Sequence, residues 1–93
     1  MDDVREFEWD AAKRLANFDK HRVDFEDIGP AFDDESALHV PDHRLDYGEE
    51  RIIMIAKCNA AILSIVYTMR GEKTRLISAR YANQRERAIY DRP

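Results

Sequence analysis

The fold is decided by residues 51–81, which read RIIMIAKCNAAILSIVYTMRGEKTRLISARY. Three runs in this stretch are rich in apolar and β-branched residues, at 52–56, 62–68 and 75–81. Such runs, bounded by turn residues, are typical of strands. The dipeptide Gly71-Glu72 fits a two-residue hairpin turn that has glycine first, and Asn59-Ala60 is a candidate for the preceding turn. The stretch therefore predicts three consecutive antiparallel strands.

The second turn fixes which side chains share a face, because side chains alternate along a strand. A turn at Gly71-Glu72 places Thr68 opposite Arg75. The same register places Val66 opposite Ile77. One face of the sheet is then expected to carry both of these pairs.

The first turn extends this face to a third strand. A turn at Asn59-Ala60 places Arg51 opposite Thr68. Four basic side chains are then expected at one end of one sheet face: Arg51, Arg70, Lys73 and Arg75. A guanidinium can donate two parallel hydrogen bonds to phosphate oxygens, so such a row suits phosphates.

Arg80 lies five residues after Arg75, and this odd spacing predicts opposite faces unless a β-bulge intervenes. Leu76 and Ser78 are expected on the same side as Arg80. Both faces are apolar in the middle of the sheet, so both need a cover. An apolar face left exposed beside a basic rim would indicate a binding surface.

The segment before these strands supplies helices. Residues 7–9 resemble a short strand, and Asp10 then suits the N-cap of a helix over 11–18. Asp24 is a candidate cap for a second helix. Gly29-Pro30 falls inside that helix and should shorten or kink it.

The remaining segments complete the expected fold. Residues 83–86, Asn-Gln-Arg-Glu, form a capping box that opens a last helix through Tyr90. An edge strand is expected at 37–40, before Pro41. Grouped helices and consecutive hairpins predict an α+β fold. We expect an antiparallel sheet of about four to five strands, two N-terminal helices and a C-terminal helix.

Length and composition limit the class of protein. The 93 residues fit a single domain spanning 1–93. Hydrophobic residues make up 44% and charged residues 37%, which argues against both a membrane protein and a disordered chain. The start, Met1-Asp2-Asp3, has no signal segment, so a cytoplasmic protein is expected. Cys58 is the only cysteine and cannot form an internal disulfide.

The charges are divided unevenly along the chain. Residues 1–50 carry 16 acidic and 6 basic side chains, whereas residues 51–93 carry 3 acidic and 9 basic ones. One interpretation is that the basic half binds a polyanion and that the acidic half meets a basic segment of a partner protein. The acidic candidates for that contact are Asp33, Asp34, Glu35, Asp42 and Asp46. The alternative is that the two halves neutralise each other within one fold.

No motif indicates a cofactor or a metal. A glycine-rich phosphate loop, a CxxC pair and an HExxH sequence are all absent. The histidines His21, His39 and His43 lack the spacing of metal ligands. We therefore expect neither a metal ion nor another cofactor.

An ordered set of short motifs resembles one protein family. The first part of the set is Phe7-Glu8-Trp9-Asp10, Lys13, Asn17, Lys20-His21 and Val23-Asp24-Phe25. The second part is Gly48-Glu49-Glu50-Arg51, Val66-Tyr67-Thr68, Arg70-Gly71, residues 75–80 (Arg-Leu-Ile-Ser-Ala-Arg), Arg85-Glu86-Arg87 and Tyr90. In this order the set resembles the BrnT toxins of type II toxin–antitoxin pairs. One departure is Arg22, where the family usually has glycine.

The resemblance implies both a fold and an activity. The fold would be a compact one similar to that of RelE ribonucleases. The activity would be RNA cleavage that arrests growth and is silenced by an antitoxin. That partner would be a BrnA-like protein with a ribbon-helix-helix domain. DNA would then be contacted only through the antitoxin, and no membrane would be involved.

A metal-independent ribonuclease activates the ribose 2′-hydroxyl against the neighbouring phosphate and stabilises the charge that develops there. Our hypothesis is that Arg70, Arg75 and Arg80 bind the phosphate and stabilise this charge. Glu86 or His21 is the candidate base or acid. The unperturbed pKa of histidine is ~6.5, whereas the pKa of Glu86 would have to be raised by burial. The further candidates for RNA binding are Lys20, Arg51, Lys73 and Tyr67.

Structural roles could also explain several of these residues. Glu86 completes the capping box, and Lys20 and His21 would end a helix, where cations complement the helix dipole. Tyr67 fits a core position, although tyrosine can also stack on a base. The arginines at the strand ends could instead be ordinary surface charges in contact with solvent.

Two other functions compete with the ribonuclease. The first is a catalytically silent binding module that acts with a DNA-binding partner as a co-repressor. The second is a stand-alone nucleic-acid-binding protein. Neither a helix-turn-helix signature nor a strongly basic helix is present, which argues against direct reading of DNA.

Overall fold

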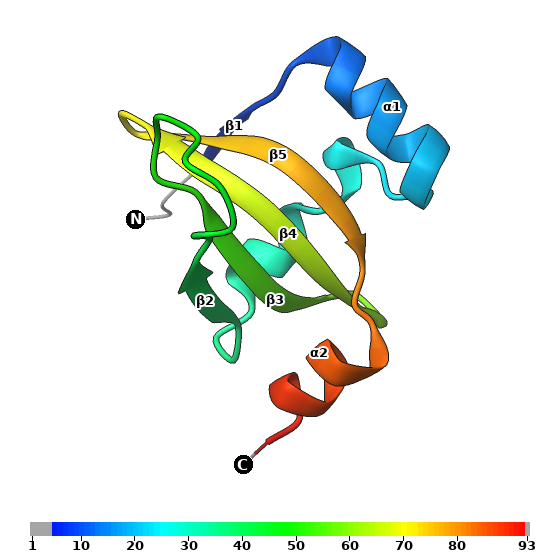
Figure 1. Ribbon diagram of the computed structural model, residues 1–93. Helices are drawn as coiled ribbons and strands as arrows, with labels where there is room; N and C mark the ends of the chain where they lie inside the picture. The colour runs from blue at the N-terminus through cyan, green and yellow to red at the C-terminus, as the bar shows by residue number, and fades with distance from the viewer. Residues whose placement is uncertain (1–4, 93) are drawn as a thin grey trace.

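The computed structural model describes residues 5–92 (Figure 1). Within them, five strands form one mixed sheet in the order β1-β5-β4-β3-β2. The strands are β1 (Glu6–Glu8), β2 (Leu38–Pro41), β3 (Ile52–Cys58), β4 (Ala61–Arg70) and β5 (Lys73–Tyr81). The helices are α1 (Ala11–His21) and α2 (Gln84–Tyr90), with the short 3-10 helices η1 (Phe25–Asp27) and η2 (Gly29–Asp33). The predicted α+β class is confirmed.

The two predicted hairpin turns are confirmed. β3 and β4 pair antiparallel around Asn59-Ala60, and β4 and β5 pair around Gly71-Glu72. Gly71 has φ +62°, in the left-handed region that glycine enters without steric cost. Thr68 lies opposite Arg75, as the turn predicted.

A β-bulge in β5 overturns one predicted pairing. Val66 lies opposite Ser78 rather than opposite Ile77, because the register shifts at Val66. Ile77 is therefore an extra residue in β5, and the alternation of faces is reset after it. Arg80 and Ser78 lie on the same face as Arg75, so the expectation that they point the other way is wrong.

β1 makes the sheet mixed, which corrects the expectation of a purely antiparallel sheet. It runs parallel to β5, with Phe7 opposite Thr74 and Glu8 opposite Arg75. A run of three residues carries no signal for the direction of its pairing. The remaining neighbouring strands pair antiparallel, including the predicted edge strand β2.

One face of the sheet, the core face, packs against η1 and η2. In Figure 1, η2 lies behind the sheet, and η1 lies between β5 and α1. The largest fully buried apolar side chains are Phe25, Ile28, Met54, Ile65 and Leu76. The last three lie on the same face of neighbouring strands. Cys58 is also buried on this side, where its Sγ donates to the backbone oxygen of Asp27 at 3.4 Å.

α1 begins and ends with specific caps. The side chain of Asp10 accepts from the backbone nitrogen of Lys13, as predicted for an N-cap. The helix ends at Arg22, which has φ 60° and donates its backbone N–H to the oxygen of Phe18. Between these caps, the buried side chain of Asn17 ties α1 to the edge of β5 at Ala79.

η1 and η2 replace the predicted second helix. Asp24 is a cap, as expected, and accepts from the backbone nitrogen of Glu26. The chain then forms two separate 3-10 helices, and Gly29-Pro30 opens the second of them. Proline lacks the N–H that a continuing α-helix would need, so the α-helical pattern ends there.

α2 begins with the predicted capping box. Asn83 and Glu86 exchange hydrogen bonds between side chain and backbone. At the other end, the Tyr90 hydroxyl donates to Asp34 Oδ2 at 2.6 Å, which ties α2 to the segment after η2. Within residues 5–92, none of the helices is long and apolar enough to span a bilayer. Met1-Asp2-Asp3, on which the expectation about a signal segment rested, lies outside the described residues.

Candidate functional site

The face opposite the core face, here called the arginine face, carries Arg51, Arg70, Arg75 and Arg80. The loop of residues 42–51 crosses in front of β4 and β5 at one end of it, and α2 lies near the other end (Figure 1). The sequence left open whether an apolar face of the sheet is exposed, and the middle of this face is largely covered. Ile55 and Val66 are each only 8% exposed.

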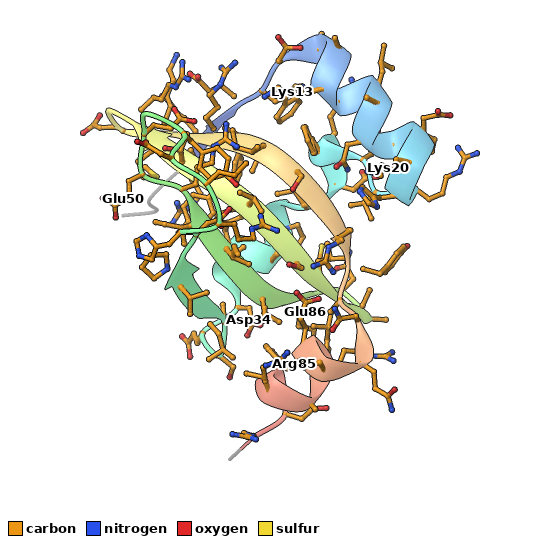
Figure 2. The ribbon with its side chains drawn as sticks, in the orientation of Figure 1. Lys13, Lys20, Asp34, Glu50, Arg85 and Glu86 are labelled. Atoms are coloured by element: carbon orange, nitrogen blue, oxygen red, sulfur yellow. The ribbon has the colours of Figure 1, made fainter. Side chains whose placement is uncertain are left out.

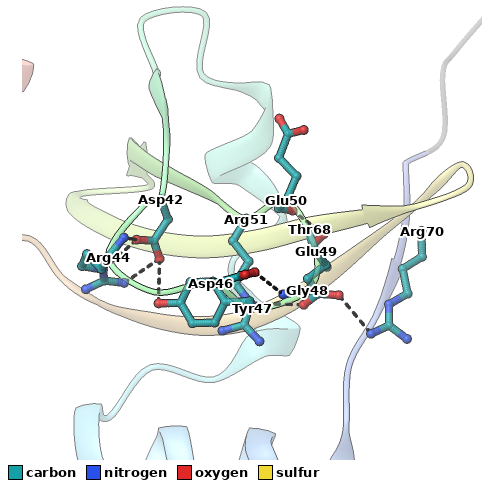
Figure 3. Close-up of polar contacts among 10 residues, drawn as sticks. All are labelled: Asp42, Arg44, Asp46, Tyr47, Gly48, Glu49, Glu50, Arg51, Thr68 and Arg70. Carbon is teal, nitrogen blue, oxygen red and sulfur yellow. Dashed lines mark hydrogen bonds and ion pairs between the residues drawn. The ribbon is translucent and has the colours of Figure 1, made fainter.

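The turn-end cluster lies on this face near the hairpin turn and consists of Glu8, Glu49, Arg51, Arg70 and Arg75. Glu8 Oε2 accepts from Arg75 Nη1 at 2.7 Å. Glu49 accepts from two arginines at once, through Oε2 from Arg51 Nε at 3.1 Å and through Oε1 from Arg70 Nη2 at 3.3 Å (Figure 3). The predicted basic row therefore exists, and carboxylates pair with its arginines.

The 42–51 loop is held by a separate set of contacts around Asp42. The side chain of Asp42 is buried and accepts two hydrogen bonds at 2.8 Å from Arg44, through Nε and Nη2. The Tyr47 hydroxyl donates to the same carboxylate at 3.3 Å. The guanidinium of Arg51 lies over the Tyr47 ring, 3.9 Å from its centre (Figure 3). The position of Arg51 therefore depends on an aromatic ring as well as on Glu49.

The helix-end cluster lies at the opposite end of the arginine face. It consists of the contacting pair Arg80 and Glu86, together with His21 and Lys20 at the end of α1, and His21 lies within electrostatic range of Arg80. Arg80 donates to Glu86 through Nη1 at 2.7 Å and Nη2 at 2.9 Å. Figure 2 shows Lys20 on α1 and Glu86 at the start of α2, with the last part of β5 between them. α1 and α2 thus bring their charged ends to the same part of β5.

The two acid–base candidates of the helix-end cluster, Glu86 and His21, have different charge states. Burial opposes ionisation of Glu86, but hydrogen bonds from Arg80 and from the Asn83 backbone outweigh it and lower its pKa. The raised pKa that acid or base chemistry would need is therefore not found at Glu86. Burial, together with the positive charges of Lys20 and Arg80, lowers the pKa of His21. His21 is then neutral at pH 7 and able to accept a proton.

The two clusters are separate places on one face. Arg75 lies opposite Thr68 and Arg80 opposite Ser64, four residues away along β4. At about 3.3 Å per residue this corresponds to roughly 13 Å. Lys73 is exposed beside the hairpin turn, next to the turn-end cluster. The structure therefore groups Arg51, Arg70 and Arg75 and keeps Arg80 apart from them.

Tyr67 lies away from the arginines, on the core face. Its ring packs edge-on against Phe32, and its hydroxyl lies 3.0 Å from His39 Nδ1. It is 7% exposed. These contacts agree with the structural role that the sequence left open for Tyr67.

Two of the acidic residues considered for a partner contact are each held by several internal hydrogen bonds. Asp34 accepts from Tyr90 and from the backbone of Lys57 and Ser36. Asp42 is buried against Arg44, as described above. Asp33, Glu35 and Asp46 are exposed.

The comparison with protein families decides the class of the chain. The model of the ribonuclease toxin BrnT, of type II toxin–antitoxin systems, matches residues 9–86. The chain belongs to the BrnT toxin family. Among curated protein sequences, none matches the chain. Within residues 5–92 there is no group of three or more His, Cys, Asp or Glu side chains that could hold a metal ion.

The structure explains one departure from the usual BrnT sequence. Arg22 occupies a helix-ending position with φ 60°, the conformation for which glycine is favoured. Its guanidinium lies 5.2 Å from the centre of the Phe18 ring, a contact that glycine could not make. The left-handed cap of this BrnT chain is therefore kept with a larger residue.

Sequence reasoning missed the carboxylates Glu8 and Glu49. Glu8 comes from β1, which is 67 residues before Arg75 in the chain, and no local pattern links the two. Glu49 is two residues from Arg51, and that spacing was the only available signal. Each of these carboxylates pairs with one or two arginines of the face and offsets their positive charge.

Proposed function

We propose that this chain is the toxin of a type II pair and that it is a metal-independent endoribonuclease acting in the cytoplasm. The observation that carries the proposal is the bulge at Ile77, which brings Arg80 onto the same face as Arg51, Arg70 and Arg75. An RNA strand that crosses the arginine face would contact cationic side chains at both ends of that face. Residues 1–93 would form a single domain with a RelE-like fold.

The arginines would serve to bind phosphates and to stabilise developing charge. Arg80 donates two hydrogen bonds to the Glu86 carboxylate, which fixes the plane of the guanidinium while part of the Arg80 side chain stays exposed. A donor fixed in this way needs little reorganisation when the phosphorane forms. In this proposal Glu86 positions Arg80, and the scissile phosphate lies at Arg80. Arg51, Arg70, Arg75 and Lys73 would bind the neighbouring phosphates.

His21 is the proposed general base. Its pKa is lowered and it lies within electrostatic range of Arg80. It would take the proton of the ribose 2′-hydroxyl as that oxygen attacks the phosphorus. The bond from phosphorus to the 5′-oxygen then breaks, which leaves a 2′,3′-cyclic phosphate, and the departing 5′-oxygen takes a proton from solvent water. Glu86 is less suited to this step, because its carboxylate already accepts from Arg80 and from the Asn83 backbone. Lys20 would bind a phosphate beside His21.

The proposed partner is a BrnA-like antitoxin with a ribbon-helix-helix domain, and DNA would be reached only through it. Membership of a type II toxin family supports a protein antitoxin. The exposed acids Asp33, Glu35 and Asp46 would suit a basic segment of such a partner.

The test is induced expression of the chain alone, with growth and RNA integrity followed in the same culture. We expect growth arrest and RNA fragmentation from the parent chain. Arg80→Ala should abolish both, whereas Arg85→Ala should not. Arg85 is a matched control because it is an exposed arginine at the start of α2. Fragmentation that persists in a folded Arg80→Ala variant would remove Arg80 from the site.

One observation favours the silent binding module as a second candidate. Arg51, Arg70, Arg75 and Arg80 each bind a carboxylate of the chain itself. A face neutralised in this way could serve only to hold a partner. Normal growth and intact RNA, with folded protein present, would support this function instead of the ribonuclease.

A further inference from the structure

Glu49 occupies a place in the turn-end cluster that resembles a ligand site. Its two carboxylate oxygens contact different arginines, Arg51 and Arg70, at 3.1 and 3.3 Å (Figure 3). The two arginines come from different elements, because Arg51 ends the 42–51 loop and Arg70 ends β4. A single anion thus bridges two cations from separate parts of the chain.

We propose that Arg51 and Arg70 form a binding subsite for an RNA phosphate and that Glu49 occupies this subsite in the free protein. A phosphate presents oxygens to a guanidinium with much the same geometry as a carboxylate does. The RNA phosphate would therefore replace Glu49 between the same two guanidinium groups. The inference rests on the proposed RNA substrate and adds a residue that competes with it.

The contacts allow Glu49 to leave without loss of the subsite. Arg51 would keep its place over the Tyr47 ring, and Tyr47 is tied to the buried Asp42. Gly48, just before Glu49, has φ +70° and open space where a side chain would lie, so no neighbouring group packs against the backbone on that side. Arg70 is 54% exposed along its side chain and can follow an incoming phosphate.

The other carboxylate of the cluster is a less suitable competitor. Glu8 belongs to β1, whose backbone is paired with β5 at Arg75. Its position is fixed by that pairing, whereas Glu49 lies in a loop. The pKa of Glu49 is lowered, chiefly by the hydrogen bond from Arg51 and against some desolvation, with Arg70 adding to the effect. Glu49 is therefore ionised at neutral pH and competes as an anion.

The test compares Glu49→Gln with Glu50→Gln. Both variants remove one negative charge from neighbouring positions of the same loop. Figure 3 shows that the Glu50 side chain points away from Arg51 and Arg70, so it controls for net charge. The probe is a single-stranded RNA with 2′-O-methyl riboses, which cannot be cleaved by attack of the 2′-oxygen. Its affinity is measured by fluorescence anisotropy at fixed salt, since phosphate contacts depend strongly on salt.

We expect Glu49→Gln to bind this RNA about three- to tenfold more tightly than Glu50→Gln does. This is the size of effect expected when a partly exposed charge that competes with the phosphate is removed. The gain should disappear when Arg70→Gln is added, because the subsite then lacks one arginine. Equal affinities of Glu49→Gln and Glu50→Gln would overturn the inference. A gain that survives Arg70→Gln would overturn it as well.

The binding assay and the RNA-cleavage assay separate the two proposals. Tighter binding by Glu49→Gln alone, without cleavage of ordinary RNA by any variant, would support the phosphate subsite and contradict the ribonuclease. Cleavage by the parent chain, with equal binding by both variants, would contradict the subsite alone. Absence of RNA binding by the parent and by all variants would overturn the subsite and the RNA substrate together.

Discussion

The side chain of Asn17 takes the place of a neighbouring strand beside Ala79. Its Nδ2 donates to the Ala79 oxygen at 2.8 Å, and its Oδ1 accepts from the Ala79 nitrogen at 3.1 Å. The same Nδ2 also donates to the oxygen of Val23 at 3.0 Å. β1 pairs with β5 only as far as Arg75, so this contact satisfies the strand where no β1 residue reaches it. One amide thereby orients α1, and with it His21 and Lys20.

Asn17→Ala should destabilise the fold markedly. The variant leaves buried backbone groups of Ala79 without partners, and each such group costs about 1–3 kcal/mol. We expect the free energy of unfolding, measured by urea titration, to fall by about 2–4 kcal/mol. Lys13→Ala, at an exposed position of the same helix, should change it by less than about 0.5 kcal/mol. Equal stabilities of the two variants would show that the edge contact is dispensable.

Tyr90→Phe should loosen the attachment of α2. The substitution removes the hydrogen bond to Asp34, and a bond to a charged group at a partly buried site contributes about 1–2 kcal/mol. We expect a loss of this size in urea unfolding at pH 7. Tyr81→Phe is the control, because Tyr81 is largely exposed. A loss no greater than that of the control would mean that Tyr90 does not anchor α2.

The contribution of Tyr90 should also depend on pH. Its bond to the Asp34 carboxylate raises the pKa of Tyr90 to about 12. A group whose pKa is raised by folding contributes stability below its unfolded pKa of about 10 and loses it as the pH rises through the folded value. The stability difference between parent and Tyr90→Phe should therefore be constant from neutral pH to pH 10 and shrink between about pH 10 and 12. A constant difference across that window would contradict the assignment.

Asp42 should make the 42–51 loop sensitive to acid. The hydrogen bonds from Arg44 lower the pKa of Asp42 to about 2, against the effect of burial. A depressed pKa contributes stability above the unfolded value and loses it as the pH falls through the folded one. The advantage of the parent over Asp42→Asn should thus decline between about pH 4 and pH 2. Asp46→Asn serves as the control, and chemical unfolding at a series of pH values is the measurement.

His21→Gln should remove the general base of the proposed reaction. The rate of RNA cleavage should fall by about 10²–10⁴-fold with folding unchanged. The parent rate should decline only at pH values below the ordinary histidine pKa, because burial, Lys20 and Arg80 lower the pKa of His21. The variant should lack this decline. His39→Gln is the matched control, since His39 lies beside Tyr67 on the core face, and an equal loss there would count against His21.

The strands, their turns and the helix caps could be predicted from the sequence because each depends on neighbours in the chain. The turn at Gly71-Glu72 needs a residue that tolerates positive φ, and glycine in first place indicates it. Asp10 and the Asn83–Glu86 pair are local hydrogen-bonding patterns. The register near the turn followed directly, so the row of Arg51 and Arg75 was predicted correctly.

The remaining features of the fold and the site depend on contacts between distant segments or on a local irregularity, and no sequence pattern indicates these. An extra residue such as Ile77 looks like any other strand residue. The sequence could therefore indicate only that a β-bulge, if present, would bring Arg80 onto the face of Arg75. The parallel pairing of β1 and the contact of Glu8 with Arg75 join segments far apart in the chain. The lowered pKa of Glu86 likewise depends on where Arg80 points, which the bulge decides.

The accessibility of Cys58 to thiol reagents can be used to measure how often the core opens on this side of the sheet. The thiol is buried beneath η1 and η2, and burial raises its pKa. A thiol-specific reagent should therefore label it faster when this end of the core separates from the sheet. Because Cys58 is the only cysteine in the sequence, the labelling rate measures a single event. Comparison of that rate with and without bound RNA or antitoxin would show whether ligands on the arginine face alter fluctuations on the opposite side of the sheet.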